Sequence, residues 1–243
     1  MPSAPLIAIV QHQGECPAAC LADWLDEAGA RLVTVRPDLG ARLPRVEELD
    51  GLVVLGGIMG ATDDAEASWL PDVRALIREC ADEEVPTLGV CLGHQLATVA
   101  LGGRVGRNPA GKQRGLLPIG YTPEALDDPL FGGLRRPVRG VHSNNDIAVE
   151  LPPDAVTLAI APGGEVQAAR LARTVWGVQW HPEVDADVFA GWCEIEPPES
   201  EQQARDGIAE VAAARSELDA AWRPLGVRFA ALCSDARDVR LAG

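Results

Sequence analysis

Short apolar runs alternate with amphipathic segments through the first hundred residues, and this alternation limits the possible folds more than any other feature. The apolar runs are 6–10, 31–35, 51–55 and 85–90. Segments 17–29 and 68–84 carry apolar residues at helical spacing. Uninterrupted apolar strands alternating with helices are typical of a parallel sheet that is covered on both faces. We therefore predict an α/β fold with a doubly wound, mostly parallel sheet.

The pattern changes after residue 103. Turns interrupt several strand-like runs, namely 115–119, 138–141, 156–160 and 166–169, which predicts a small antiparallel extension. A last strand over 175–180 completes the first domain, residues 1–184. Residues 185–243 are predicted to form a C-terminal helical appendage packed on that domain, in which Pro224 ends one long helix before a final helix near 227–238.

Composition excludes several classes of function. The 243 residues are 47% hydrophobic, enough for a large core without disulfides, and the net charge of −15 argues against a nucleic-acid partner. The start of the chain lacks the pattern of a leader, and no apolar stretch reaches the roughly 18 to 20 residues of a membrane span. The six cysteines form no paired motif with ligand spacing. We expect a cytoplasmic protein with no membrane association, no metal and no cofactor, acting on a small molecule.

A cysteine lies at the junction between the apolar run 85–90 and a helical segment that ends near Leu101. The glycines two residues before and after Cys91 permit a tight turn from which the cysteine side chain projects. A thiol at a helix N-terminus is also favoured as thiolate by the helix dipole. This pattern predicts a nucleophile elbow with cysteine in place of serine.

Other candidate groups also lie at the ends of strands, and in such sheets ligands bind beyond the carboxyl ends of strands. A backbone N–H of the Gly56-Gly57 turn and that of Leu92 would together form an oxyanion hole. His181 and Glu183 supply a base and a group that orients it. His94 is expected to be structural, with its ring hydrogen-bonded internally. His12 is expected to be packed or solvent-exposed.

Residues 89–95, Gly-Val-Cys-Leu-Gly-His-Gln, and 177–183, Gly-Val-Gln-Trp-His-Pro-Glu, resemble the class I, triad-type glutamine amidotransferases, closest to the GMP-synthase-like branch. The resemblance runs from about Leu6 to Glu183. It implies a flavodoxin-like fold and a catalytic cysteine triad. The implied roles are nucleophile for Cys91, acid/base for His181, orienting partner for Glu183, oxyanion hole for Gly57 and Leu92, and substrate binding for Gln95.

Two segments depart from the family pattern. Residues 113–116 read Gln-Arg-Gly-Leu where relatives often have Glu-x-Gly-Trp or Glu-x-Gly-Tyr, and residues 143–146 read Ser-Asn-Asn-Asp where many have a His-Gly-Asp or His-x-Asp segment. Both segments are expected to take part in substrate selection or partner contact. Gly115 and Asn144 are therefore added to the candidate substrate-binding residues.

The resemblance implies hydrolysis of the glutamine side-chain amide to glutamate and ammonia through a γ-glutamyl thioester. Because the roughly 60 residues after Glu183 are too few for an ATP-using synthetase domain, the protein would act alone or with a separate synthetase subunit that receives ammonia. One alternative is a hydrolase of γ-glutamyl amides or peptides. Another is a catalytically silent binding or regulatory module.

Overall fold

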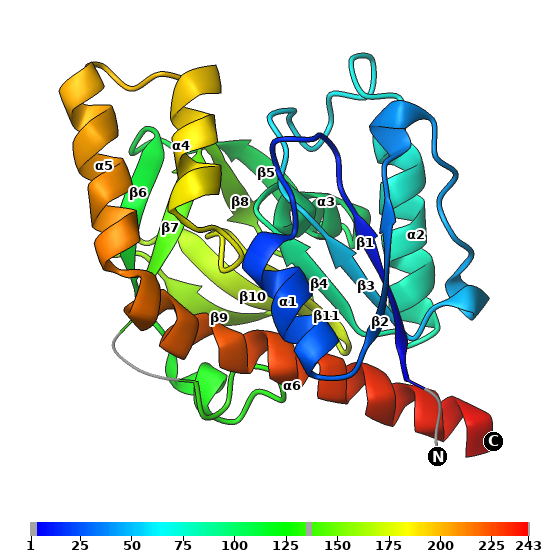
Figure 1. Cartoon of the computed structure of the whole chain (residues 1–243). Coiled ribbons are helices and arrows are strands. Elements are labelled where there is room, and N and C mark those ends of the chain that lie inside the picture. The colour runs from blue at the N-terminus through cyan, green and yellow to red at the C-terminus, as the bar shows by residue number, and fades with distance from the viewer. Residues whose placement is uncertain (1–3, 135–137, 243) are drawn as a thin grey trace.

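The computed structural model describes residues 4–134 and 138–242, and its centre is a seven-stranded sheet (Figure 1). The strand order is β2-β1-β3-β4-β11-β10-β9. The bounds are β1 Leu6–Val10, β2 Arg31–Val35, β3 Gly51–Val54, β4 Thr87–Val90, β9 Val156–Ile160, β10 Val166–Ala172 and β11 Val175–Val178. All neighbours from β2 to β11 pair in parallel, whereas β10 and β9 add antiparallel strands at one edge.

Helices cover both faces of the sheet. Alternate residues of a strand point to opposite faces, and Ile7 and Ile9 of β1 belong to one buried cluster while Ala8 and Val10 belong to another. The first cluster includes residues of α1 (Ala19–Glu27), and the second includes residues of α2 (Leu70–Asp82) and α3 (Leu92–Ala100). The prediction of a doubly wound, mostly parallel sheet is therefore confirmed.

The predicted antiparallel extension is present, divided between two small sheets and one edge of the main sheet. β6 (Gln113–Ile119) pairs with β7 (Val138–Asn144), and β5 (Arg104–Arg107) pairs with β8 (Asp146–Glu150), each as a two-stranded antiparallel sheet. The runs 156–160 and 166–169 instead extend the main sheet as β9 and β10. Short 3₁₀ segments lie at Pro37–Leu39, Val46–Glu48 and Pro123–Leu126.

The C-terminal region contains α4 (Ala186–Ile195), α5 (Glu201–Ala213) and α6 (Arg215–Ala242). The expectation that Pro224 ends a helix is wrong, because α6 continues through it. Proline removes a hydrogen bond to the carbonyl four residues earlier, and both Pro224 and Ala220 are exposed, so water can bond that carbonyl. In the described part of the chain, no helix has the length and apolar character needed to cross a membrane.

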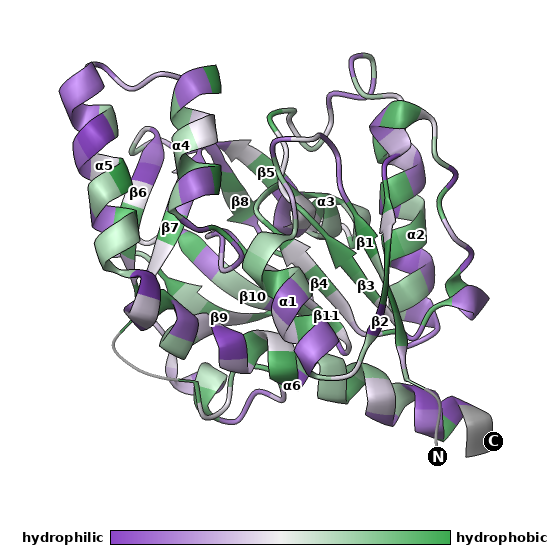
Figure 2. Ribbon diagram, in the orientation of Figure 1, coloured by the Kyte–Doolittle hydropathy of each residue, from purple (hydrophilic) through white to green (hydrophobic). Residues whose placement is uncertain are grey.

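Helix α6 packs across the sheet domain and shares its core (Figures 1 and 2). Trp222 is fully buried, its ring lies 4.8 Å from that of Trp180, and its indole N–H donates to the Arg139 carbonyl at 3.1 Å. Arg139 also forms an ion pair with Glu217 at 2.7 Å. The packing of these helices on the sheet is therefore extensive, and the boundary at residue 184 stays a prediction. The chain start, for which no leader is predicted, lies partly outside the described residues.

Candidate active site

Cys91 occupies a tight turn between β4 and α3. Its φ of 51° and ψ of −103° lie in a region that residues with a Cβ rarely adopt. A Cβ on Gly93 would lie 1.9 Å from the Val54 carbonyl oxygen, and one on Gly89 would lie 2.5 Å from the Gly93 backbone. Only glycine fits at both positions, so the predicted strand–turn–helix elbow is confirmed.

His181 follows β11 and reaches the same point from the neighbouring strand. Its Nδ1 lies 2.7 Å from Oε1 of Glu183, and both residues are buried. Burial lowers the pKa of His181, but the Glu183 carboxylate and a hydrogen bond with the Cys91 sulfur outweigh it and raise the pKa to about 10. The imidazole is therefore able to hold a proton at neutral pH while facing the cysteine.

The Gly56-Gly57 turn after β3 passes directly against both groups. A Cβ on Gly56 would lie 2.8 Å from Cε1 of His181 and 3.6 Å from Cβ of Cys91. A Cβ on Gly57 would lie 2.9 Å from Cδ2 of Leu92. The two glycines thus allow the backbone to approach closely, and they bring Gly57 beside Leu92, as an oxyanion hole requires. The role of their N–H groups stays a prediction.

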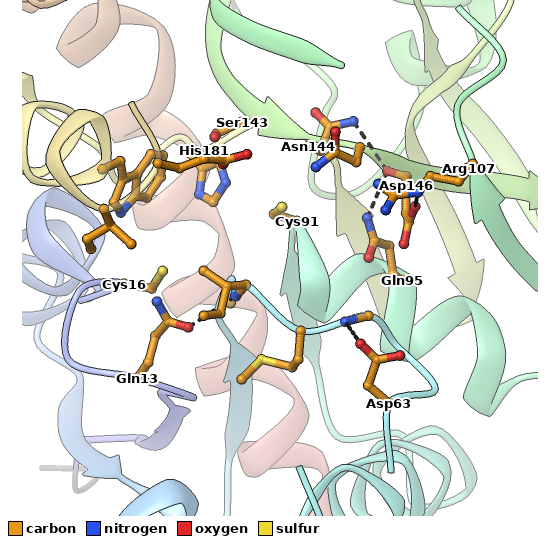
Figure 3. A pocket seen from close by; sticks show the side chains of 18 residues that line it. Gln13, Cys16, Asp63, Cys91, Gln95, Arg107, Ser143, Asn144, Asp146 and His181 are labelled. Carbon is orange, nitrogen blue, oxygen red and sulfur yellow. Dashed lines mark hydrogen bonds and ion pairs between the residues drawn. The ribbon is translucent and has the colours of Figure 1, made fainter. Parts of the chain in front are cut away.

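A cavity of about 520 Å³ lies in front of the elbow (Figure 3). Of the candidate site residues, Gly57, Cys91, Gln95, Asn144 and His181 line it. Glu183 does not line the cavity; it lies behind the His181 ring, in contact with its Nδ1.

Gly115, predicted to bind substrate, does not line the cavity. It lies on β6 opposite His142 of β7, and Ser143 and Asn144 at the end of β7 are the residues that reach the cavity. Gly115 is therefore not placed to contact a ligand in this cavity directly, and its part in substrate binding stays a prediction. From the same segment, Gln113 accepts a hydrogen bond from the Asn144 side chain.

The amide groups of Gln95 and Asn144 are held by the protein through their nitrogens. Gln95 Nε2 donates to the Asp146 carbonyl at 2.9 Å and to Oε1 of Gln179 at 3.3 Å. Asn144 Nδ2 donates to Oε1 of Gln113 at 3.1 Å and to the same Asp146 carbonyl at 3.2 Å. Each NH₂ group has two hydrogens, so the side-chain oxygens are the atoms left for a ligand. Within the described residues, Oδ1 of Asn144 is buried without a partner.

Sequence reasoning missed several residues at the site. Gln179 Nε2 lies 3.5 Å from Cys91 Sγ, and its position two residues before His181, in the extended segment directly after β11, could have suggested a shared face. Trp192 of α4 packs its ring 4.5 Å from that of His181. Cys16 also lines the cavity, where burial, then Cys91 and Glu183, raise its pKa to about 12. No local sequence signal marks Trp192 or Cys16.

The other two histidines singled out from the sequence are both fully buried. The expectation of an internal hydrogen bond for His94 is wrong, because neither ring nitrogen has a partner in the described part of the chain. The His94 ring instead packs directly against Gly177, where an added Cβ would lie 2.0 Å from Nδ1 of His94. His12 accepts a hydrogen bond from Trp69 Nε1 at 3.1 Å. Burial lowers the pKa of each to about 4, so both are neutral.

Across residues 4–134 and 138–242, no group of three or more His, Cys, Asp or Glu residues is placed to hold a metal ion.

Comparisons with known proteins find several relatives of this chain. Residues 19–190 match the family model of class I glutamine amidotransferases. The chain is 38% identical over 151 residues to a glutamine-hydrolyzing GMP synthase of Aeropyrum pernix, covering 60% of this chain but 26% of that protein. It is 28% identical over 146 residues to gamma-glutamyl peptidase 5 of Arabidopsis thaliana, covering 59% of this chain and 57% of the relative. The chain thus spans less than two thirds of each of these relatives.

A solved structure extends the similarity to nearly the whole chain. The crystal structure of a glutamine amidotransferase from Thermotoga maritima is 25% identical, with a TM-score of 0.83, and the match covers 93% of this chain and 98% of the other.

Proposed function

The chain belongs to the class I glutamine amidotransferase family, and from this premise we propose that it hydrolyses the side-chain amide of glutamine to glutamate and ammonia. One observation carries the proposal. The Cys91 thiol and the His181 ring meet at one cavity, and Glu183 holds the far side of that ring at 2.7 Å. A nucleophile, an acid/base and an orienting carboxylate in this order are the requirements of acyl transfer.

In the proposed reaction, the Cys91 thiolate attacks the side-chain carbonyl carbon of glutamine. The backbone N–H groups of Gly57 and Leu92 bind the oxyanion of the tetrahedral intermediate. The carbon–nitrogen bond then breaks as His181 gives its proton to the amide nitrogen, which departs as ammonia and leaves a γ-glutamyl thioester on Cys91. His181, now neutral, takes a proton from water, which attacks the thioester and releases glutamate and the thiolate.

Two amide side chains are proposed to orient glutamine. Because the NH₂ groups of Gln95 and Asn144 are used within the protein, their oxygens would accept hydrogen bonds from the substrate. The α-ammonium group of glutamine is the matching donor. A glutamine analogue without the α-ammonium group is expected to bind weakly, since the side-chain oxygens of Gln95 and Asn144 would remain unpaired.

Whether the protein has a synthetase partner depends on what happens to the ammonia that it releases. The chain corresponds to 26% of the Aeropyrum pernix GMP synthase, so a synthetase that consumes ammonia has no counterpart among the matched residues. We propose that the protein hydrolyses glutamine either alone or for a synthetase on a separate subunit.

A second candidate substrate class is a γ-glutamyl amide with a larger amine. The match to a gamma-glutamyl peptidase and the cavity of about 520 Å³ favour it, since pockets of about 300 to 1,000 Å³ hold ligands of drug-like size. The same triad would cleave such an amide, with the amine leaving in place of ammonia.

The test compares wild type with Cys91→Ala and Cys91→Ser on glutamine and on a series of γ-glutamyl amides. Both variants are expected to lose turnover, and mass spectrometry should detect a γ-glutamyl adduct on Cys91 of the wild type. Cys80→Ala, a change at a buried cysteine of α2, is the control. Glutamine turnover that survives in Cys91→Ala would sink the proposal.

Two further results would redirect it. Strong hydrolysis of γ-glutamyl amides with negligible glutamine turnover would favour the second substrate class. A glutamine-like diazo ketone that fails to label Cys91 would favour a silent binding module.

A further inference from the structure

We propose that Gln179 holds the Cys91 nucleophile as a thiolate by donating an N–H to its sulfur, and that Gln95 fixes the orientation of the Gln179 amide. In this scheme Gln179 touches the reacting atom, whereas Gln95 is a positioning residue. The inference rests on the proposed role of Cys91 as nucleophile.

The three residues form a continuous buried chain. Gln179 Nε2 lies 3.5 Å from Cys91 Sγ, and Gln179 Oε1 accepts from Gln95 Nε2 at 3.3 Å. Gln95 Nε2 also donates to the backbone carbonyl of Asp146 at 2.9 Å. Gln179 is fully buried and Gln95 is 4% exposed. Water therefore has little access to these amides, so it would not supply the hydrogen bonds that a flipped orientation would leave unmade.

The direction of the chain follows from the carbonyl at its end. The nitrogen and oxygen of a glutamine amide differ in role, because only the nitrogen donates. The Asp146 carbonyl can only accept, so the nitrogen of Gln95 must face it. The second hydrogen of that nitrogen then points to the oxygen of Gln179. This leaves the nitrogen of Gln179, and hence an N–H, directed at the sulfur.

A donor in this position favours one protonation state of the cysteine. Cys91 is 5% exposed, and burial alone disfavours a charged thiolate. The His181 ring supplies one hydrogen-bond partner for the sulfur, and Gln179, directly after β11, supplies a second. Hydrogen bonds to the charged form stabilise that form, so each of these donors would act in favour of the thiolate.

The same donor has an opposite effect on reactivity once the thiolate exists. Lowering the pKa of a thiol also lowers the intrinsic nucleophilicity of its thiolate. Removing the Gln179 donor should therefore reduce the thiolate fraction at neutral pH, while the rate of the fully ionised cysteine stays the same or rises. A purely structural role for Gln179 would lower reactivity at every pH.

The experiment follows the alkylation of Cys91 by iodoacetamide across pH, with the modified peptide quantified by mass spectrometry. In Gln179→Met the midpoint of the pH profile is expected to move up by about one unit, because a hydrogen bond to a charged group is lost. The plateau at high pH should be unchanged or higher.

Gln167→Met is the matched control. Gln167 is 1% exposed on the adjacent strand β10, and its amide bonds the Gly120 N–H and the Pro118 carbonyl, away from the sulfur. It should lose comparable packing and hydrogen bonds without moving the midpoint. An equal shift in this control would overturn the inference.

Two more variants test the direction of the chain. Gln179→Glu can still accept from Gln95 but cannot donate when ionised, so it should move the midpoint at least as far as Gln179→Met. Gln95→Met frees the Gln179 amide to turn and should give a smaller shift in the same direction. Circular dichroism identifies folded variants, and Gln179→Glu serves alone if Gln179→Met does not fold.

The outcome separates this inference from the proposed function, because alkylation needs no substrate. Midpoints equal to wild type in the folded Gln179 variants, with Cys91 reactive in the wild type, would overturn only the role of Gln179. Retained glutamine turnover in Cys91→Ala would instead overturn the proposed function.

Discussion

Replacing Glu183 with glutamine tests how the site holds a proton on His181. The change keeps the size of the side chain and removes the negative charge that lies 2.7 Å from Nδ1. A hydrogen bond to a charged group contributes about 1.5 to 3 kcal/mol and a neutral one about 0.5 to 1.5 kcal/mol. The difference of about 1.5 kcal/mol corresponds to about one pKa unit.

The sign of the effect follows from the causes acting on His181. Burial lowers its pKa and Glu183 raises it. Without the carboxylate the lowering by burial remains, so the pKa should fall by at least about one unit. The imidazolium that would protonate the leaving amide nitrogen would then be lost at a lower pH. Replacing the orienting aspartate of a Ser-His-Asp triad with asparagine lowers kcat by about 10⁴. A large loss of turnover should therefore accompany the shift in the pKa of His181.

The assay measures glutamate release by Glu183→Gln across the neutral and alkaline range. The alkaline limb of kcat/KM should move to lower pH, and kcat should fall by about two to four orders of magnitude. Glu194→Gln makes the same exchange at an exposed position of α4 and should match wild type. An alkaline limb at the wild-type position, with turnover close to wild type, would refute the reasoning.

Two further predictions concern the packing that supports the site. Trp222→Ala removes a fully buried indole and should lower the free energy of unfolding by about 3 to 5 kcal/mol in urea, whereas Arg223→Ala, exposed beside it, should change little. Equal losses would contradict the docking of α6. Gly93→Ala should prevent the elbow from forming, since its Cβ would lie 1.9 Å from the Val54 carbonyl oxygen. Gly191→Ala meets nothing within 4 Å in α4 and should be neutral or stabilising; a folded, active Gly93→Ala would refute the steric argument.

Local sequence signals predicted the tight turn at Cys91 well. The apolar run before Cys91 and the glycines on either side of it are short-range features, and the structure follows them closely. The sequence linked His181 to Cys91 only through chemistry and family resemblance, because a cysteine nucleophile needs a base. That β11 lies beside β4, so that their carboxyl ends meet at one edge, is seen only in the structure.

Prediction failed where tertiary packing overrides local preference. Pro224 lies inside α6 because the buried residues around it, Trp222 and Phe229 among them, reward a continuous helix more than one lost hydrogen bond costs. Trp192 reaches His181 only because α4 docks there, which no local pattern specifies. Gln179 differs from these, since its two-residue spacing from His181 was visible in the sequence.

The elbow at Cys91 also says something about what this fold gives up. A residue with a Cβ at a φ of 51° and a ψ of −103° is held against its own preference, at a cost of about 1 to 3 kcal/mol. Folded domains have a free energy of unfolding of about 5 to 15 kcal/mol, so the strained backbone of this one residue lowers stability by an appreciable fraction of that total. Selection for a stable chain alone would place glycine at this position. Stability therefore favours glycine at position 91, whereas the proposed chemistry requires cysteine there.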